Sequence, residues 1–122
     1  MGPNGIAVER LLRATADVDA ETAVELVTED FVYEVVDLDT YRGKDGLRTF
    51  LGDQSSLMAV HRALGRFVES GDDVAVERVD TMVFGVGPVD VPTAAFFTCR
   101  EGRVSHWIDY QDLREVARTL GH

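Results

Sequence analysis

The sequence predicts an α+β protein in which helices pack on the concave side of a curved β-sheet. Apolar residues in the first third of the chain recur at helical spacing, whereas the second half consists of strand-like runs separated by short turns. Helices followed by a meander of strands are typical of the α+β class. No repeat, linker or low-complexity segment divides the 122 residues, so we expect one domain over residues 1–122, with a pocket between helices and sheet.

Three helices are predicted in the first half of the chain. Their apolar faces comprise Val8, Leu11, Leu12 and Thr15 in the first helix, Ala23, Leu26 and Val27 in the second, and Leu47, Phe50 and Leu51 in the third. Asp19 is expected to cap the second helix. The β-rich segment Phe31–Val36 predicts a strand between the second and third helices. The turn-forming residues of Asp37–Gly46 are expected to form a solvated loop before the third helix.

Four strands and a last helix are predicted in the second half. The strands are Leu64–Ser70, Val74–Phe84, Val89–Cys99 and Arg103–Gln111. The segments between them, at residues 71–73, 85–88 and 101–102, are rich in Gly, Asp and Pro and favour hairpin turns. Asp112 and Glu115 have the spacing of a capping box. The helix after them presents Leu113, Val116, Ala117 and Leu120 on one face and can end at Gly121.

Composition excludes several classes of partner. Lys and Arg number 12 against 22 Asp and Glu, and a net charge of −10 argues against nucleic acid and anionic membrane surfaces. Cys99 is the only cysteine, so no intramolecular disulfide can form, and the three histidines lack metal-ligand spacing. No apolar run approaches the roughly 18–20 residues that span a bilayer, and the first residues lack the features of a signal peptide. We therefore expect a cytoplasmic protein without a metal site.

Two charged residues stand in the middle of the predicted strand Val74–Phe84. Because side chains alternate along a strand, Arg78 and Asp80 share one face with the apolar residues at positions 74, 76, 82 and 84. If that face meets the core, both charges are desolvated and must pair with each other or with other groups. If it meets solvent, they form a surface ion pair of little energetic value. The opposite face is also fairly apolar, and spacing alone favours the surface pair.

A second carboxylate lies on the predicted strand Arg103–Gln111, where Asp109 shares a side with Trp107. Two acids that flank one arginine on neighbouring strands can serve as general acid and general base, because one protonated and one ionised carboxyl group supply both proton transfers. Alternatively, Asp109 ends a strand and hydrogen-bonds backbone at the turn into the last helix. Tyr33 is either a core residue or the source of a hydroxyl that orients a water or a substrate oxygen.

Three segments resemble the limonene-1,2-epoxide hydrolase family. They are Phe31–Glu34, Val76–Asp80 with the motif Arg-x-Asp, and Glu101–Leu113 with the motif Trp-x-Asp-Tyr-x-Asp-Leu. The first acids of the two motifs, Asp80 and Asp109, stand 29 positions apart, and the likeness follows the order of elements over nearly the whole chain. This resemblance implies a curved mixed sheet with the cone shape of nuclear-transport-factor-2-like (NTF2-like) and SnoaL-like proteins, assembled as a homodimer.

The resemblance also implies a one-step hydrolysis without metal, cofactor or covalent intermediate, in which water adds to an epoxide and gives a vicinal diol. Asp109 matches the general base, which takes a proton from the attacking water. Asp80 matches the general acid, which protonates the epoxide oxygen as the ring opens. Arg78 matches the residue that bridges both carboxylates, and the Tyr33 hydroxyl matches the one that helps to hold the water.

Val35 departs from the family pattern, which has Asn two residues after the tyrosine. Valine neither donates nor accepts a hydrogen bond, so a water at that point loses one of three protein partners, a loss of about 1–3 kcal/mol. Three explanations are open. Asp37 or Gln111 replaces the missing amide, the nucleophile is a hydroxyl within the substrate, or hydrolysis is slow or lost.

The sequence thus predicts an epoxide hydrolase whose partners are water and a small apolar epoxide, held in a hydrophobic pocket. Candidates for the pocket or the core are Val35, Leu47, Phe50, Leu51, Met82, Phe84, Phe96, Phe97 and Trp107. One alternative is an epoxide-opening cyclase or an isomerase that acts on a polyketide or steroid-like substrate. The other is a non-catalytic ligand-binding or dimerisation domain in which the charged cluster is purely structural.

Overall fold

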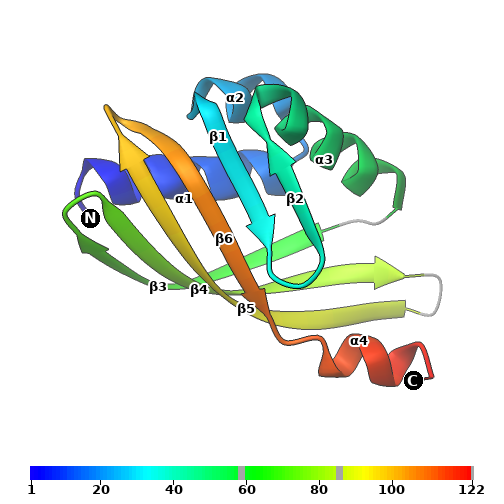
Figure 1. The fold of residues 1–122 in the computed structure, drawn as a ribbon. Coiled ribbons are helices and arrows are strands. Elements are labelled where there is room, and N and C mark those ends of the chain that lie inside the picture. The colour runs from blue at the N-terminus through cyan, green and yellow to red at the C-terminus, as the bar shows by residue number, and fades with distance from the viewer. Residues whose placement is uncertain (58–59, 85–86, 122) are drawn as a thin grey trace.

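The computed structural model of the protein describes residues 1–57, 60–84 and 87–121, which form one curved sheet with helices on one face (Figure 1). The strands are β1 (Val27–Val35), β2 (Asp39–Arg42), β3 (Val60–Ser70), β4 (Asp73–Phe84), β5 (Gly87–Arg100) and β6 (Arg103–Gln111). The helices are α1 (Pro3–Ala16), α2 (Ala20–Glu25), α3 (Gly43–Leu57) and α4 (Arg114–Thr119).

The strand order is β2-β1-β6-β5-β4-β3, with β1 and β6 parallel and the other neighbours antiparallel. The first strand therefore lies beside the last one, although they are far apart in the sequence (Figure 1). In this register Tyr33 is opposite Trp107 and Val35 is opposite Asp109. The topology thus brings the predicted tyrosine and one of the predicted acids to the same place.

Bulges bend the sheet. The register shifts between Leu64 and Phe67 where β3 pairs with β4, and between Thr98 and Cys99 where β5 pairs with β6. An extra residue in one strand bends that strand and increases its twist. Gly65 lies in the first of these irregularities, where a Cβ atom would stand 3.0 Å from the carbonyl oxygen of Glu77. Only glycine fits this close approach of two backbones without a shift.

Helices α1, α2 and α3 cover the concave face, and the core lies between them and the sheet (Figure 1). The predicted apolar face of the first helix is confirmed, since Val8, Leu11, Leu12 and Thr15 are all fully buried. The predicted fold class, a curved mixed sheet with N-terminal helices on its concave side, is confirmed as well.

Two predicted elements differ near the start of the sheet. Asp19 caps α2 as expected, accepting a hydrogen bond from the Thr22 amide, but the helix ends at Glu25 and not beyond Val27. The β-branched residue Val27 begins β1 instead, opposite Val104 of β6. Within the segment expected to be a loop, Asp39–Arg42 forms β2, because an edge strand needs backbone pairing on only one side and tolerates polar residues.

The predicted hairpin turns at residues 71–72 and 101–102 are confirmed, and Glu101 and Gly102 both adopt positive φ angles. The turn before β5 includes residues 85–86, which lie outside the described residues. The capping box before the last helix is wrong. Asp112 instead accepts hydrogen bonds from the Arg114 amide and guanidinium, and no side chain caps α4. The predicted apolar face of α4 is not buried, because this helix leaves the sheet beside β5 and has no layer to pack against.

Within the described residues, the helices are too short or too polar to cross a lipid bilayer.

Candidate active site

The charged face of β4 points into the core. Arg78 is 3% exposed and Asp80 is 1% exposed, in line with the buried side chains of Val74 and Val76. The alternative of a surface ion pair is therefore wrong. Burying charged groups is unfavourable unless they are paired and hydrogen-bonded, so the neighbours of these two side chains decide whether the site is stable.

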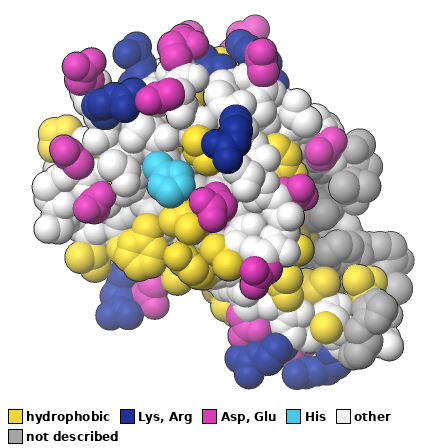
Figure 2. Space-filling view, viewed as in Figure 1, with side chains coloured by type: hydrophobic (Ala, Val, Ile, Leu, Met, Phe, Trp, Pro, Cys, Tyr) yellow, Lys and Arg dark blue, Asp and Glu magenta, His cyan; other side chains and the backbone are white. Residues whose placement is uncertain are grey.

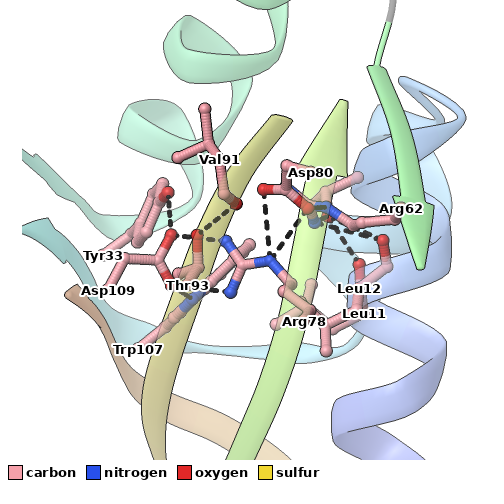
Figure 3. A network of polar contacts seen from close by, with 11 residues as sticks. Leu11, Leu12, Tyr33, Arg62, Arg78, Asp80, Val91, Thr93, Trp107 and Asp109 are labelled. Atoms are coloured by element: carbon pink, nitrogen blue, oxygen red, sulfur yellow. Dashed lines mark hydrogen bonds and ion pairs between the residues drawn. The ribbon is translucent and has the colours of Figure 1, made fainter. Parts of the chain in front are cut away.

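Arg78 binds both predicted catalytic acids (Figure 3). Its Nη1 and Nη2 donate to Oδ1 and Oδ2 of Asp109 at 2.9 and 2.7 Å, which is a bidentate contact. Its Nε donates to Oδ1 and Oδ2 of Asp80 at 3.1 and 3.2 Å. A planar guanidinium is suited to this geometry, because its donors form a fixed fork. The two carboxylates are thus held on either side of one cation, which is the arrangement that the family resemblance implies and that spacing alone left open.

Asp109 receives two further hydrogen bonds. The Tyr33 hydroxyl donates to Oδ2 at 2.7 Å, and the Trp107 indole nitrogen donates to Oδ1 at 2.6 Å. Burial raises the pKa of Asp109, but the charge and hydrogen bonds of Arg78, together with these two donors, outweigh it and lower the pKa below its ordinary value. Asp109 is therefore ionised at neutral pH. The ionised form is the one that can accept a proton from water.

The aromatic rings fix the orientation of these donors. The Tyr33 and Trp107 rings stack with centroids 4.1 Å apart, and Phe50 packs edge-on against Tyr33 at 4.9 Å. Burial and the nearby Asp109 raise the pKa of Tyr33 well above its ordinary value, so its hydroxyl keeps its proton. Tyr33 can therefore act as a permanent donor beside Asp109.

Arg62 is a member of the cluster that the sequence analysis missed. Its Nε donates to Oδ1 of Asp80 at 3.1 Å, and its Nη1 donates to the Leu12 carbonyl at 3.2 Å and the Thr15 hydroxyl at 2.7 Å (Figure 3). The predicted strand begins at Leu64, so Arg62 falls outside it, whereas β3 begins at Val60 and puts Arg62 directly opposite Asp80. Extending the alternation backward from Leu64 is the signal that identifies Arg62.

The predicted pocket residues fall into three groups. Buried next to the cluster or in the core are Val35, Leu47, Leu51, Phe97 and Trp107, and half-buried are Phe50 and Met82. The side chain of Phe84 lies outside the described part of the structure. Phe96 is wrong as a pocket residue, because it is 53% exposed on the opposite face of β5, where it packs against Tyr110.

Of the two groups expected to replace the missing amide, Asp37 does not lie in the cluster. It is exposed in the turn after β1, with a φ of 63°. Gln111 is half-buried at the end of β6, two residues beyond Asp109. Val35 itself is 9% exposed and lies opposite Asp109 across the β1–β6 pairing. An apolar side chain thus stands beside the ionised carboxylate.

A hollow of about 950 Å³ is bordered by strands β3 to β6 and includes Arg78 in its lining. It is lined by convex-face residues such as Val79, Pro92 and Tyr110, and by Leu113 and Arg114 at the start of α4. In the part of the chain that the structure describes, no three His, Cys, Asp or Glu side chains are arranged to hold a metal ion. The chemically equipped site is therefore the cluster around Arg78.

The curved sheet and its helical cover form an NTF2-like α+β fold. An NTF2-like protein of unknown function from Burkholderia pseudomallei K96243 superposes with a TM-score of 0.87 at 19% identity, over the whole of both chains. The model of the limonene-1,2-epoxide hydrolase catalytic domain matches residues 3–121, so the chain belongs to the limonene-1,2-epoxide hydrolase family. The predicted family is confirmed.

A protein and a solved structure from Mycobacterium tuberculosis are similar to this chain. The epoxide hydrolase EphG is 28% identical over 114 residues, which are 93% of this chain and 76% of that protein. The structure of an LEH-like (limonene-1,2-epoxide hydrolase-like) epoxide hydrolase superposes with a TM-score of 0.85 at 27% identity, covering 97% of this chain and 89% of the other. These relatives support the prediction that the protein is an enzyme of the epoxide hydrolase type.

Proposed function

We propose that the protein hydrolyses an epoxide in one step, with Asp109 as general base and Asp80 as general acid. Water attacks an epoxide carbon while Asp109 accepts its proton. The carbon–oxygen bond breaks, and the ring oxygen receives a proton from Asp80. The product is a vicinal diol, and one proton must pass back from Asp109 to Asp80 before the next turnover. Each proton transfer by a positioned side chain contributes about 10²- to 10⁴-fold in rate.

The observation that carries this proposal is the bridge from Arg78 to both carboxylates. It keeps the two acids on either side of one buried cation, at 2.7–2.9 Å from Asp109 and 3.1–3.2 Å from Asp80. Two carboxylates with different surroundings can hold different protonation states, which a concerted push and pull of protons requires. Tyr33 supports the same proposal, since its hydroxyl stays protonated beside Asp109 and can help to hold the water.

We also propose that the substrate is a small apolar epoxide. Val35 and Trp107, which adjoin Asp109, belong to an aliphatic and aromatic core that also contains Leu47 and Leu51, with Phe50 packed against it. Apolar walls around a few polar groups are typical of small-molecule sites. This assignment rests on the buried neighbours of the cluster together with the family to which the chain belongs.

The labelling of the product tests the proposal directly. The protein is incubated with limonene oxide or cyclohexene oxide in ¹⁸O-labelled water. In a single turnover with excess enzyme, direct attack places one ¹⁸O atom in the diol. A first turnover that yields an unlabelled diol instead indicates transfer of oxygen from an enzyme carboxylate and contradicts the proposal. The absence of any diol from either substrate also counts against it.

Val35 favours a second candidate function, the opening of an epoxide by a hydroxyl group of the same substrate. With an apolar side chain opposite Asp109, the water has fewer protein partners than the family pattern provides. A hydroxyl that is tethered to the epoxide needs less help, because it is already held close to the ring. A cyclic ether formed from a hydroxy-epoxide, without incorporation of label, identifies this reaction.

We further propose that two copies of the chain associate through the convex face of the sheet. Figure 2 shows hydrophobic side chains gathered over this face. Phe96 and Tyr110 are 53% and 48% exposed and pack edge to face with centroids 6.1 Å apart, and Val68 is 63% exposed. Exposed apolar patches of this kind commonly mark protein–protein interfaces. A two-fold axis would place this patch against its own copy.

A further inference from the structure

Asp80 lies between two arginines. Arg62 donates to its Oδ1 from β3, and Arg78 donates to both of its oxygens from β4. The side chains of Arg62, Arg78 and Asp80 are 6%, 0% and 1% exposed. Water therefore does little to screen the three charges from one another. The proposed general acid therefore contacts a second cation, Arg62, in addition to Arg78, which bridges it to Asp109.

The charges in this cluster balance when both acids are ionised. Two guanidinium groups, Arg62 and Arg78, then face two carboxylates, Asp80 and Asp109. When Asp80 takes up a proton, the buried cluster acquires a net charge of +1. A net charge in dry surroundings is unfavourable, so Arg62 opposes the protonated form that general-acid catalysis needs.

The described residues place further groups around Asp80 and Arg62 from β5, α1 and β6. The residue of β5 that pairs with Asp80 is the apolar Val91. From α1, Thr15 and Leu12 contribute a hydroxyl and a carbonyl, which bind Arg62 and carry no charge. Arg13 of α1 and Asp17 at its end line a hollow of about 220 Å³ together with Arg62. The negative charge of Asp109 on β6 is taken up by Arg78.

Further titratable groups lie near this cluster. Tyr33 on β1 bonds to Asp109 and keeps its proton. His61 of β3 is exposed next to Arg62 in the chain. Among the residues that the structure describes, Arg62 is the charged side chain that contacts Asp80 from outside the Arg78 bridge.

We propose that Arg62 is a positioning residue that holds Asp80 from outside the Arg78 bridge and favours the ionised form of this carboxyl group. This inference rests on the proposed role of Asp80 as general acid. An opposite charge at hydrogen-bonding distance moves the titration of a carboxyl group by about 1–3 pH units. The contacts with Thr15 and Leu12 fix the Arg62 guanidinium in place, so helix α1 holds the residue that tunes the acid.

Substitution of Arg62 by methionine tests this role, because methionine keeps much of the side-chain length but removes the charge. The variant leaves Asp80 with its hydrogen bonds from Arg78 and leaves Thr15 with the carbonyls of Leu11 and Leu12. We expect the alkaline limb of the kcat–pH profile to move up by about 1–3 pH units. Arg62→Lys keeps the charge and is expected to keep the limb near its wild-type position.

The matched control is Arg66→Met on the same strand. Arg66 is 82% exposed and pairs with Glu77 outside the cluster, so its loss is expected to leave the profile unchanged. If Arg62→Met lowers kcat equally at every pH, Arg62 is merely structural and the inference is overturned. Arg62→Gln, which retains a polar group, gives the same comparison if the methionine variant does not fold.

A second measurement separates this inference from the proposed function. Carboxyl ¹³C NMR of protein labelled at aspartate Cγ follows the titration of Asp80 directly, with Asp80→Asn to assign its signal. We expect the midpoint to move to higher pH in Arg62→Met and to stay in place in Arg66→Met. Unchanged midpoints overturn the inference even if epoxides are hydrolysed. A shifted midpoint without any turnover supports the inference and counts against Asp80 as a general acid for epoxides.

Discussion

The Tyr33 hydroxyl donates a 2.7 Å hydrogen bond to Asp109, 76 positions further along the chain. The parallel pairing of β1 with β6 makes this contact possible, because it sets Tyr33 beside Trp107, which donates to the other oxygen of the same carboxylate. The two donors and Arg78 satisfy Asp109 within a dry core. These hydrogen bonds hold the Asp109 carboxylate in place, and the proposed role of Asp109 as a base depends on them.

Replacing Tyr33 by phenylalanine removes one of these hydrogen bonds and keeps the ring. We expect the free energy of unfolding to fall by about 1.5–3 kcal/mol, the usual contribution of a hydrogen bond to a charged group. We expect kcat for epoxide hydrolysis to fall by about 10-fold or more, since the water loses a partner. Urea unfolding and steady-state kinetics provide the measurements. Tyr110→Phe, at an exposed tyrosine, is the control, and equal effects in both variants would contradict the role of Tyr33.

Asparagine at position 35 restores the amide of the family pattern next to Asp109. If the missing hydrogen bond limits hydrolysis, Val35→Asn raises kcat by about 10-fold, which corresponds to roughly 1.4 kcal/mol of transition-state stabilisation. Val35→Ala, which adds no polar group, is the matched control. Initial rates of diol formation measure the effect. An asparagine variant no faster than the alanine variant indicates that another group holds the water or that the nucleophile belongs to the substrate.

The lowered pKa of Asp109 predicts how stability changes with pH. Since folding favours its ionised form, the contribution of Asp109 to stability is complete above the ordinary value of 3.8 and is lost as the pH falls through the lower value of the folded state. We expect the free energy of unfolding to decrease below about pH 4. The decrease should be smaller in Asp109→Asn, as urea titrations at a series of pH values can show. Parallel curves for the two proteins are incompatible with a perturbed Asp109.

A charge on the convex face of the sheet tests the proposed homodimer. Phe96→Glu introduces a carboxylate at an exposed aromatic position of the patch, where burial against a second copy is unfavourable. We expect sedimentation velocity to show a dimer for the wild-type protein and a monomer for this variant. Leu38→Glu, at a leucine that is 60% exposed in the turn between β1 and β2, should remain dimeric. A wild-type protein that sediments as a monomer contradicts the proposal.

The alternation of side chains along β4 and β6 predicted which charged residues share a face of their strand. It did not predict which face of the sheet meets the core. Arg78 and Asp80 lie between two fairly apolar faces, so local pattern could not decide their burial, and the helical cover decides it. Arg62 was missed because the apolar signal of β3 starts at Leu64, whereas pairing with β4 extends the strand back to Val60. When a strand is stabilised mainly by pairing with a neighbouring strand, its own residues show only a weak β-strand pattern.

The predictions for β2 and α4 were wrong for the same reason: long-range packing, and not local sequence, determines both elements. Asp39–Arg42 consists of residues that also form turns, and its pairing with β1 makes it a strand. The apolar positions of α4 predicted a buried face, but this helix follows the last strand and projects beside β5, where the chain offers no second layer. Local sequence identifies the apolar positions, while long-range packing determines whether they are covered.

The most direct test of the central claim compares Asp109→Asn and Asp80→Asn with Asp90→Asn on an epoxide that the wild-type protein hydrolyses. Asp90 is an exposed aspartate of β5 that bonds to Thr81, so its variant controls for the substitution itself. With folding checked by circular dichroism, we predict that kcat falls by at least about 100-fold in the first two variants and stays near wild type in the third. Turnover within about 10-fold of wild type in a folded Asp109→Asn or Asp80→Asn protein would contradict the assignment of these two acids as base and acid.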